Sequence, residues 1–573
     1  MTSSRILRFA FSSNSAKQLA TIEPKLANWP VVYTIRNSSQ IYVGETTSAE
    51  MRMRQHTEPA SKKQLEEVSV ILDETFNKSA CLDLESQLIK YFFADEKFEV
   101  LNGNSGIVES DYFDRDRYQK TFDQIFSLLC EQGVLTRSVP ELVNSDFFKY
   151  SPFKSLNNEQ STAVTDILEN LLVNIKRTIG ATFVVQGSPG TGKTIVAIYL
   201  MKLIADLKRL DESEAPSEES QFHEFFFGEN RELAFKLENC ALVIPQQSLR
   251  ASIKKVFKKT PGLSEKMVIT PFELGKSNSK FDLVIVDEAH RLQQRANQSS
   301  AVLNKQYREI NLTLFGKDDL NKTQLDWVMA KSYHQILLID TAQAVKPADL
   351  PSEVLEREVE IASLNKNFFS LSNQMRVLGG DDYIRFIGDF LAGQADESPQ
   401  FEGYDLRVFE DLQEMRNEII RLDGEFGLSR MVAGFAWPWV SKKQPNNPDI
   451  RIDGLELFWN QTAQDWINSK NSVNEVGSIH TVQGYDLNYA GVIIGNDLSY
   501  DPQTETFKFN RENYHDVKGK ENNTTLGIKY SDDDLLEFVK NIYRVLLTRG
   551  IRGTFIYAVD PGLRNKLLTT LNH

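Results

Sequence analysis

The clearest chemical signal in the sequence is the octapeptide GSPGTGKT, which begins at Gly187 and ends at Thr194. It fits the phosphate-binding pattern G-x-x-x-x-G-K-[ST], and it lies between a β-rich run, TFVVQ, and a helical run, TIVAIYLMKLIADL. In this context backbone N–H groups wrap nucleotide phosphates, and the helix N-terminus favours their negative charge. We expect Lys193 to reach the β- and γ-phosphates of ATP, and Thr194 to hold Mg²⁺ through its hydroxyl. The predicted loop residues are Gly187, Ser188, Pro189, Gly190, Thr191, Gly192, Lys193 and Thr194.

Two adjacent carboxylates, Asp287 and Glu288, follow the apolar run FDLVIV further along the chain. Carboxylates at the end of a buried strand are costly unless they serve charge chemistry. Asp287 suits the coordination shell of Mg²⁺, and Glu288 suits the orientation and activation of an attacking water. The alternative is an ordinary acidic turn at a strand end, which the phosphate-binding loop upstream disfavours.

A second set of polar residues lies near the start of the chain. The stretch VVYTIRNSSQIYVGET contains two β-rich runs around a polar turn, which predicts a hairpin. The following TTSAEMRMRQH is helical, and its Arg52 and His56 are four residues apart, so they share one helix face. A later helical run, CLDLESQLIKYFF, carries Glu85. Alone, these features predict only a small α/β block.

Two groups of short apolar runs supply the strands that must hold the phosphate-binding loop and the acidic pair. The first group comprises ATFVVQG, CALVIPQ, FDLVIVDEA and HQILLID, and the second comprises SRMVAGFAW, VGSIHTVQG, GVIIGND and GTFIYAV. Each run is nearly continuous in apolar residues, which is typical of strands buried on both faces of a parallel sheet. We therefore predict two parallel α/β sheets, one before and one after about residue 365.

Length, composition and charge limit the classes of protein to which this chain can belong. The chain has 573 residues, too many for one core, and its 41% hydrophobic and 25% charged residues are typical of soluble globular proteins. A net charge of −14 excludes a basic surface over the whole molecule, although a local basic groove is enough for nucleic acid. The 3 cysteines form neither a disulfide framework nor a zinc pattern. The cysteine pattern suits a reducing cytosol, so we expect a cytoplasmic protein, and no apolar run approaches the ~18 residues of a membrane helix.

Further motifs resemble those of superfamily 1 helicases and occur in the same order. LNNEQ precedes the octapeptide, and VIPQQSLRASI, IDTAQAVKP, SNQMR, HTVQGYDL and YRVLLTRG follow it. The sequence looks closest to Schlafen-type (DUF2075-like) helicase domains. VIPQQSLRASI stands where that family contacts single-stranded nucleic acid.

The helicase resemblance implies roles for further residues. Gln160 would read the adenine, and Gln343 would sense the γ-phosphate. Arg376 and Arg549 would neutralise phosphate charge from the second sheet domain, with Arg549 as the arginine finger. Gly484, in the fifth motif, would complete the nucleotide site.

The front block resembles the GIY-YIG nuclease family. The two signature triplets of that family correspond to Val31-Val32-Tyr33 and Tyr42-Val43-Gly44, so the first triplet retains only its tyrosine. The family's arginine, histidine, glutamate and asparagine correspond to Arg52, His56, Glu85 and Asn102, with Asn104 a less suitable choice for the last. The alternatives are a non-catalytic relic of this fold and an unrelated α/β block.

The nuclease resemblance implies cleavage of a phosphodiester by an activated water with one divalent metal. Glu85 would hold Mg²⁺ or Mn²⁺. Tyr33 would act as general base or orient the water, alone or with His56. Arg52 would stabilise the transition state, and Tyr42 would support the phosphate or Arg52. Asn102 would fix the local geometry.

Together these resemblances imply an α/β multidomain chain, in which a small GIY-YIG-like domain precedes two RecA-like parallel-sheet domains. The predicted segments are an N-terminal extension (1–27), the nuclease-like domain (28–108), a helical connector (109–150), and RecA-like domains over 151–365 and 366–573. The implied function is an ATP-dependent translocase or helicase with a fused endonuclease, with DNA favoured over RNA and bacterial genome defence as a role. The alternative is an ATP-gated nucleic-acid-binding switch or scaffold with a non-catalytic front domain.

Overall fold

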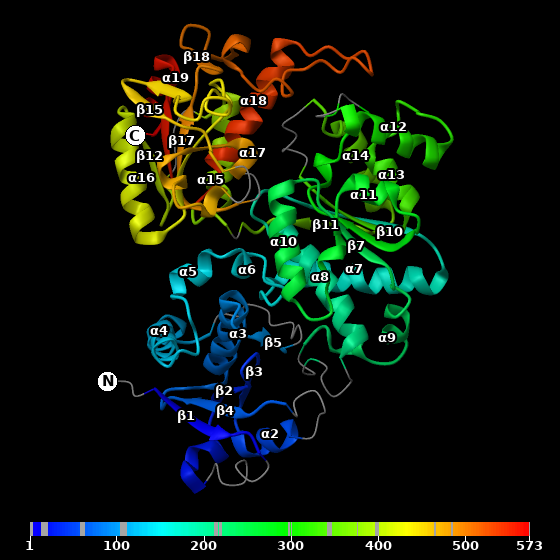
Figure 1. The fold of residues 1–573 in the computed structure, drawn as a ribbon, viewed down its shortest axis with the longest axis vertical. Coiled ribbons are helices and arrows are strands. Elements are labelled where there is room, and N and C mark those ends of the chain that lie inside the picture. The colour runs from blue at the N-terminus through cyan, green and yellow to red at the C-terminus, as the bar shows by residue number, and fades with distance from the viewer. Residues whose placement is uncertain are drawn as a thin grey trace. The chain divides into compact units, whose positions relative to one another are not determined.

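The computed structural model describes residues 4–12, 21–57, 64–102, 112–210, 216, 220–295, 298, 301–340, 347–374, 376–395, 400–462, 466–482 and 485–571 (Figure 1). The chain forms two compact units. One comprises residues 1–172, 195–237 and 252–267, and the other comprises residues 173–194, 238–251 and 268–573. None of the helices in these described ranges combines the length and the apolarity needed to cross a bilayer.

The first unit begins with a five-stranded sheet in the order β1-β4-β2-β3-β5. Its strands are β1 (Arg5–Ala10), β2 (Val31–Arg36), β3 (Gln40–Thr46), β4 (Glu67–Leu72) and β5 (Glu99–Val100). Strands β1, β4, β2 and β3 pair antiparallel, and β5 pairs parallel to β3. The predicted hairpin is therefore present as β2 and β3, and the predicted N-terminal extension supplies β1.

Helices cover this sheet and fix its polar residues in place. They are α2 (Ala49–His56) and α3 (Lys78–Asp95), preceded by the short η1 (Pro24–Ala27). The face that carries Tyr33 packs with Ala49 and Met53 of α2, and all three side chains are buried. Helix α3 packs against β2 and β3. The two helices thus bring the family's arginine, histidine and glutamate to the same pair of strands.

The predicted connector is helical and packs on α3. It contains α4 (Arg115–Glu131), α5 (Val139–Asn144) and α6 (Asp146–Lys149). Aromatic rings join α3 to the connector helices. The ring centroids are 4.7 Å apart for Tyr91 and Phe126 of α4, and 5.7 Å apart for Phe93 and Phe147 of α6. These contacts bury the far side of the helix that carries Glu85.

The second unit contains two parallel sheets, as predicted. The first has the order β11-β6-β10-β9-β7-β8. Its strands are β6 (Ala181–Gly187), β7 (Cys240–Val243), β8 (Val268–Ile269), β9 (Phe281–Val286), β10 (Ser332–Ile339) and β11 (Phe368–Leu371). All of these pairings are parallel. Because β11 pairs with β6, the first sheet continues past residue 365.

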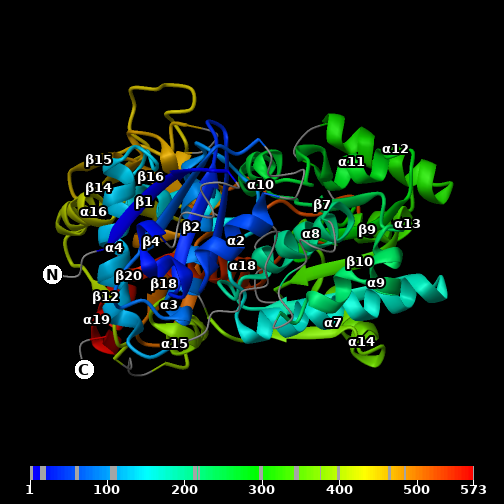
Figure 2. The same cartoon turned by 90° about the horizontal axis from the view of Figure 1, so that it is seen from below.

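Helices lie on both sides of this sheet. In Figure 2, α11 (Pro271–Lys276) and α12 (Ala301–Phe315) lie beyond one side of β9 and β10, and α14 (Ser352–Leu364) lies beyond the other. The remaining helices in this part of the chain are α7 (Asn158–Arg177), α8 (Lys193–Arg209), α9 (Gly228–Ala234), α10 (Gln247–Lys259) and α13 (Gln324–Lys331). The core between sheet and helices is aliphatic, with Val284, Val286 and Leu337 buried at its centre.

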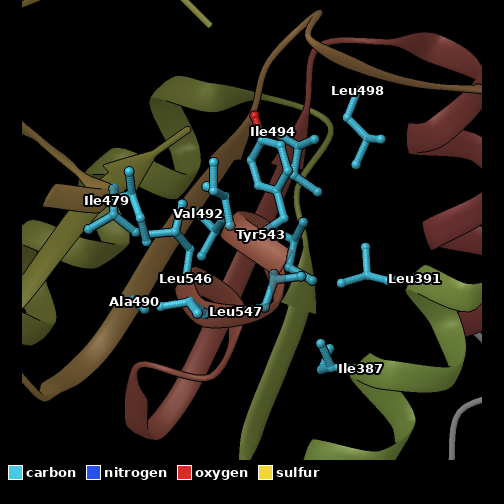
Figure 3. Close-up of a cluster of buried hydrophobic side chains, with 14 of the residues drawn as sticks. Ile387, Leu391, Ile479, Ala490, Val492, Ile494, Leu498, Tyr543, Leu546 and Leu547 are labelled. Carbon is cyan, nitrogen blue, oxygen red and sulfur yellow. The ribbon is translucent and has the colours of Figure 1, made fainter. Parts of the chain in front are cut away.

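The second sheet has the order β12-β20-β17-β13-β16, again all parallel. Its strands are β12 (Asp405–Val408), β13 (Ser429–Ala433), β16 (Val476–Ser478), β17 (Leu487–Ile494) and β20 (Gly550–Ala558). Helices α15 (Gly380–Ala392), α16 (Leu412–Phe426), α17 (Ile479–Val482), α18 (Asp532–Leu547) and α19 (Pro561–Leu571) accompany it. Figure 3 shows its core, where Val492 and Ile494 of β17 meet Tyr543 and Leu547 of α18 and Leu391 of α15.

Two antiparallel hairpins extend the second-sheet region, β14 (Ile450–Ile452) with β15 (Leu455–Leu457) and β18 (Leu498–Asp501) with β19 (Thr506–Phe509). After the second hairpin, residues 516–531 form a segment that we call the docking arm. Asn523 of this arm donates from Nδ2 to the Arg295 carbonyl at 3.3 Å, and the Tyr530 hydroxyl donates to the Pro347 carbonyl at 3.1 Å. The arm therefore bonds to the backbone of the first-sheet region.

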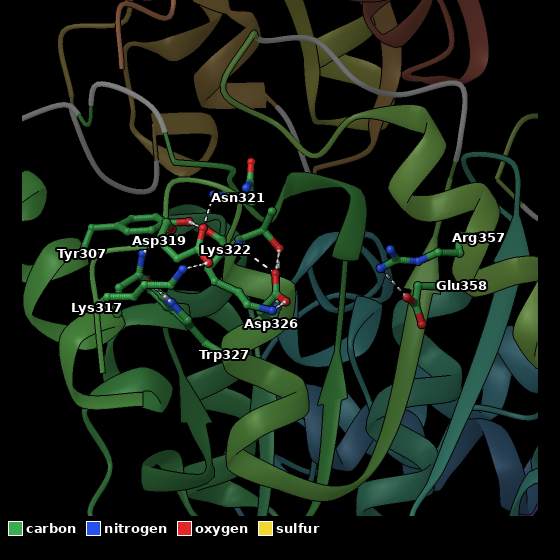
Figure 4. A network of polar contacts seen from close by, with 11 residues as sticks. Tyr307, Lys317, Asp319, Asn321, Lys322, Asp326, Trp327, Arg357 and Glu358 are labelled. Carbon is green, nitrogen blue, oxygen red and sulfur yellow. Dashed lines mark hydrogen bonds and ion pairs between the residues drawn. The ribbon is translucent and has the colours of Figure 1, made fainter. Parts of the chain in front are cut away.

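Figure 4 shows a polar network of the first-sheet region that includes Tyr307, Lys322 and Asp326. Lys322 pairs with Asp326 at 2.8 Å, and the Tyr307 hydroxyl donates to the Lys322 carbonyl at 3.0 Å. Next to it, Arg295 pairs with Asp318 at 3.1 Å, and its guanidinium lies 5.0 Å from the Tyr307 ring centroid. Arg295, whose carbonyl accepts from Asn523, is therefore held through its side chain by Asp318 and Tyr307.

Candidate active sites

The octapeptide forms the connection between β6 and α8, as the motif requires. Gly190 and Gly192 have φ of 88° and 82°, in the left-handed region that favours glycine. A Cβ added at Gly190 would lie 2.0 Å from Oε1 of Gln374. The loop therefore needs glycine both for its backbone path and for close approach by Gln374, which belongs to the SNQMR motif.

Lys193 folds over this loop. Its Nζ donates to the carbonyls of Gly187 at 2.6 Å and Ser188 at 3.0 Å, and the residue is 7% exposed. An ammonium at the mouth of a glycine-rich loop is placed to contact phosphate oxygens when these replace the carbonyls.

Thr194 and Asp287 meet where β6 and β9 end. The Thr194 hydroxyl donates to Oδ2 of Asp287 at 2.8 Å. Burial, together with the adjacent Glu288 carboxylate, raises the pKa of Asp287 above its ordinary range. A hydroxyl and a carboxylate are the hard oxygen donors that suit Mg²⁺. Within the described ranges no three acidic, histidine or cysteine side chains form a metal-binding group, so an ion here would take its other ligands from nucleotide and water.

Glu288 is held by a histidine from the same motif. His290 Nε2 lies 2.8 Å from Oε2 of Glu288, and the Asp340 backbone N–H donates to His290 Nδ1 at 3.1 Å. Because Nδ1 accepts, the imidazole has a proton on Nε2, the nitrogen that lies 2.8 Å from the carboxylate. Burial opposes ionisation of Glu288, but His290 and nearby Lys193 outweigh it and lower its pKa. Glu288 is therefore an ionised carboxylate and is linked to the end of β10.

The segment after β11 also reaches the loop. Gln374 donates from Nε2 to the Pro189 carbonyl at 2.5 Å and accepts the Arg376 backbone N–H at 2.8 Å. Arg376 Nε lies 2.5 Å from Oδ1 of Asp486. The structure thus brings Arg376 to the loop region, and it adds Gln374 and Asp486, which were not among the predicted site residues.

Two other predicted nucleotide residues make hydrogen bonds to the backbone. Arg549 is 4% exposed and donates to the Tyr485 carbonyl at 3.4 Å, just before β20 and β17 begin. Gln160 accepts the Asn157 backbone N–H at 3.1 Å at the start of α7. Gln343 and Gly484 lie outside the described residues.

In the front domain, Tyr33 is the centre of the predicted site. Its hydroxyl lies 2.6 Å from His56 Nε2 and accepts from Arg52 Nε at 3.4 Å. Tyr42 packs edge-on against the His56 ring, with centroids 5.0 Å apart. Burial raises the pKa of Tyr33 well above its ordinary value, so the phenol keeps its proton and can donate it to His56 Nε2 when that nitrogen is unprotonated.

Strand register gives Tyr33 its place. Tyr33 stands opposite Gly44 across β2 and β3, and a Cβ at Gly44 would lie 2.3 Å from the Tyr33 hydroxyl. Asn102 pins the neighbouring residue, because its Oδ1 accepts from Val43 N–H at 3.0 Å and its Nδ2 donates to the Val43 carbonyl at 2.8 Å. The family glycine and asparagine therefore act on the backbone around the tyrosine.

Glu85 lies on α3, half-buried beside this cluster. Burial, and next the carboxylate of Glu45, raise its pKa to about 8, while Arg52 lowers it. Glu85 also raises the pKa of Tyr42, after burial, to about 12. A divalent cation would favour ionised Glu85, so this carboxylate fits a metal site with water as the remaining ligands. Glu45, the residue after the family glycine, was not predicted.

Comparisons with known proteins find a family model over each of the two regions that carry these sites. A model of the Schlafen group 3 DNA/RNA helicase domain matches residues 180–560, and a model of the GIY-YIG catalytic domain matches residues 30–97. Fold and sites thus define a nuclease-family domain joined to a helicase-family domain. The chain belongs to the Schlafen group 3 helicase family.

Individual relatives are more distant. An uncharacterized protein of Saccharomyces cerevisiae, YPL245W, is 27% identical over 422 residues, which cover 68% of this chain and 84% of the relative. An arterivirus nonstructural protein 10 helicase solved with DNA is 13% identical, with 69% and 63% of the two chains covered and a TM-score of 0.27. A Bacteroides Pif1 helicase solved with ADP-AlF3 and single-stranded DNA is 10% identical, with 68% and 91% covered and a TM-score of 0.25.

Proposed function

We propose that this chain is an ATP-driven translocase or helicase whose front domain is a metal-dependent endonuclease, with DNA as substrate. The observation that carries the proposal is the arrangement at the ends of β6 and β9. There Thr194 bonds to Asp287 at 2.8 Å, and Glu288 lies 2.8 Å from His290. A hydroxyl, two carboxylates and an ordered lysine at a glycine loop are what phosphoryl transfer to water requires.

In the ATP step, Lys193 exchanges its contacts with backbone carbonyls for contacts with phosphate oxygens. Mg²⁺ held by Thr194 and Asp287 would neutralise phosphate charge when bound. Glu288, ionised and oriented by His290, accepts a hydrogen bond from the attacking water. Because the Asp340 backbone holds His290, a change at the acidic pair moves the end of β10. Through this hydrogen bond, the structural change that accompanies ATP hydrolysis would reach the rest of the first sheet.

In the nuclease step, Tyr33 is 0% exposed, so the attacking water must reach its hydroxyl from beneath the side chains that meet the substrate. Arg52 is exposed and Tyr42 and Glu85 are half-exposed, so these three face the phosphate. A water loses its proton to the Tyr33 hydroxyl, whose own proton passes to His56 Nε2. The water oxygen bonds to phosphorus, the bond to the leaving oxygen breaks, and solvent protonates that oxygen. A metal on Glu85 would supply charge neutralisation.

The test is a cleavage assay on single-stranded, duplex and forked DNA, and on matched RNA, with Mg²⁺ or Mn²⁺ and with or without ATP. The parent should cleave DNA and show nucleic-acid-stimulated ATP turnover. Glu85→Ala should lose cleavage alone, and Lys193→Ala should lose ATP turnover. If the parent hydrolyses ATP but never cleaves, the ATP-gated switch with a non-catalytic front domain replaces the nuclease. A genome-defence role predicts that both variants lose protection against phage or plasmid entry.

A further inference from the structure

Helix α10 carries a row of lysines on one face. Its buried face consists of Leu249, Ser252, Ile253, Val256 and Phe257. The opposite face presents what we call the lysine face, which comprises Lys254, Lys255, Lys258 and Lys259, three of them exposed and Lys254 half-exposed. The chain has a net charge of −14, yet it has no acidic residue between Glu238 and Glu265. A local positive potential therefore stands on an otherwise acidic protein.

Three lysines of this face, Lys254, Lys258 and Lys259, lack the partners that residues on a solvated helix face usually have. Lys254 and Lys258 are four residues apart, as are Lys255 and Lys259, and like charges at this spacing destabilise a helix. Across the part of the chain that the structure describes, no carboxylate lies within ion-pair distance of Lys254, Lys258 or Lys259. By contrast, Lys305 and Lys540 pair with carboxylates on their own helices. An external anion would remove the repulsion.

The fifth basic residue of α10, Arg250, stabilises the local backbone. Arg250 is half-buried and donates from one guanidinium nitrogen to the carbonyls of Ile244 at 2.8 Å and Pro245 at 3.2 Å. These bonds fix the turn from β7 into α10, at the same sheet edge at which β6 and β9 end. Arg250 therefore positions the helix, and the lysine face projects from a fixed support.

The chemistry of the face selects its ligand. None of the large hydrophobic side chains that are exposed in the described ranges lies on α10, so the face lacks the apolar anchors of a protein-binding hot spot. Its cations are lysines, which bind phosphate as point charges. Lys254 and Lys259 are ~7.5 Å apart along the helix axis at 1.5 Å per residue, a span of about two phosphates along one strand of a duplex.

We propose that the lysine face binds the phosphate backbone of nucleic acid without regard to sequence. It would do so as a contact separate from the VIPQQSLRASI segment at the start of α10. This inference rests on the proposed function, because the lysine face would give the translocating ATPase a second contact with its nucleic-acid substrate.

The test compares two charge-matched triple variants. One is Lys254→Gln, Lys258→Gln and Lys259→Gln, and the control is Lys305→Gln, Lys443→Gln and Lys470→Gln, three exposed lysines outside α10. Fluorescence anisotropy with a labelled 30-nucleotide single strand, measured at several salt concentrations, gives the slope of log K against log salt. Loss of three phosphate contacts should reduce that slope by about 2, at ~0.7 per contact, and weaken binding more than tenfold at low salt. The control should match the parent.

Folding is checked by ATP turnover without nucleic acid, which the lysine-face variant should retain. The corresponding Lys→Arg triple variant keeps the charge and should restore the parent slope. An unchanged slope in the Lys→Gln variant would show that the face is only solvated, and it would overturn the inference while the proposed function stands. A parent that neither binds the strand nor raises its ATP turnover would overturn both.

Discussion

Gly44→Ala offers the sharpest test of the front domain, because the residue changed carries no reactive group. A Cβ at this position would lie 2.3 Å from the Tyr33 hydroxyl oxygen, whereas ordinary contact begins at 3.4 Å, so the ring must move by about 1.1 Å. Tyr33 is 0% exposed and packs in the domain core. It can move only by giving up its 2.6 Å contact with His56.

The effects of Gly44→Ala on stability and on the cleavage rate can both be estimated. Forcing one extra methyl group into a packed core costs about 1–3 kcal/mol of unfolding free energy. A displacement of about 1 Å within a catalytic group costs on the order of 10²-fold in rate. We therefore expect Gly44→Ala to cleave about a hundredfold more slowly than the parent, with ATP turnover unchanged.

The assay is single-turnover cleavage of a labelled DNA duplex with Mn²⁺, run beside ATP turnover and urea unfolding of the same samples. Gly424→Ala is the matched control, because a Cβ at that helical position meets nothing within 4 Å. Cleavage by Gly44→Ala within twofold of the parent, at parental stability, would refute the role given to the Tyr33–His56 contact.

Three further outcomes are expected. Glu288→Gln should slow ATP turnover by about 10²–10⁴-fold while equilibrium nucleotide binding, measured by calorimetry, persists. Burial raises the pKa of Asp497 to about 7, so the folded state retains a proton that the unfolded chain releases near pH 4. Stability should fall as pH rises from about 4 to 7, and urea midpoints should show a flatter profile for Asp497→Asn. Tyr530→Phe removes the hydrogen bond to Pro347 and should cost about 0.5–1.5 kcal/mol, whereas Tyr333→Phe, at a ring that is 53% exposed, should cost nothing measurable by urea unfolding.

Features encoded in contiguous sequence could be predicted. The loop that ends in Lys193 and Thr194 needs a strand before it and a helix after it, and both follow from local apolar patterns. Asp287 stands out because a charged pair closes an apolar run. The parallel sheets follow for the same reason, since strands buried on both faces consist of nearly uninterrupted apolar residues.

Contacts between distant segments could not be predicted. Gln374 reaches Pro189 across 185 positions, and His290 meets the Asp340 backbone across 50. Gln374 lies in the SNQMR motif and His290 follows Asp287 and Glu288, but these motifs do not indicate the Pro189 carbonyl or the Asp340 backbone as partners. Glu45 is similar, because only the packing of α3 on β3 places it near Glu85. Periodicity specifies which face of an element is buried but not which partner covers it.

The docking arm affects how this chain can be divided. A cut between β11 and α15 would separate the two parallel sheets in sequence, yet the arm would still join the resulting fragments through Asn523 and Tyr530. Fragments split at that point should therefore copurify, whereas fragments that also lack residues 516–531 should separate more readily. Expression of either sheet region alone would leave one side of the Asn523 contact, now 3% exposed, open to water. A shortened version of this protein should therefore contain both parallel sheets and the docking arm.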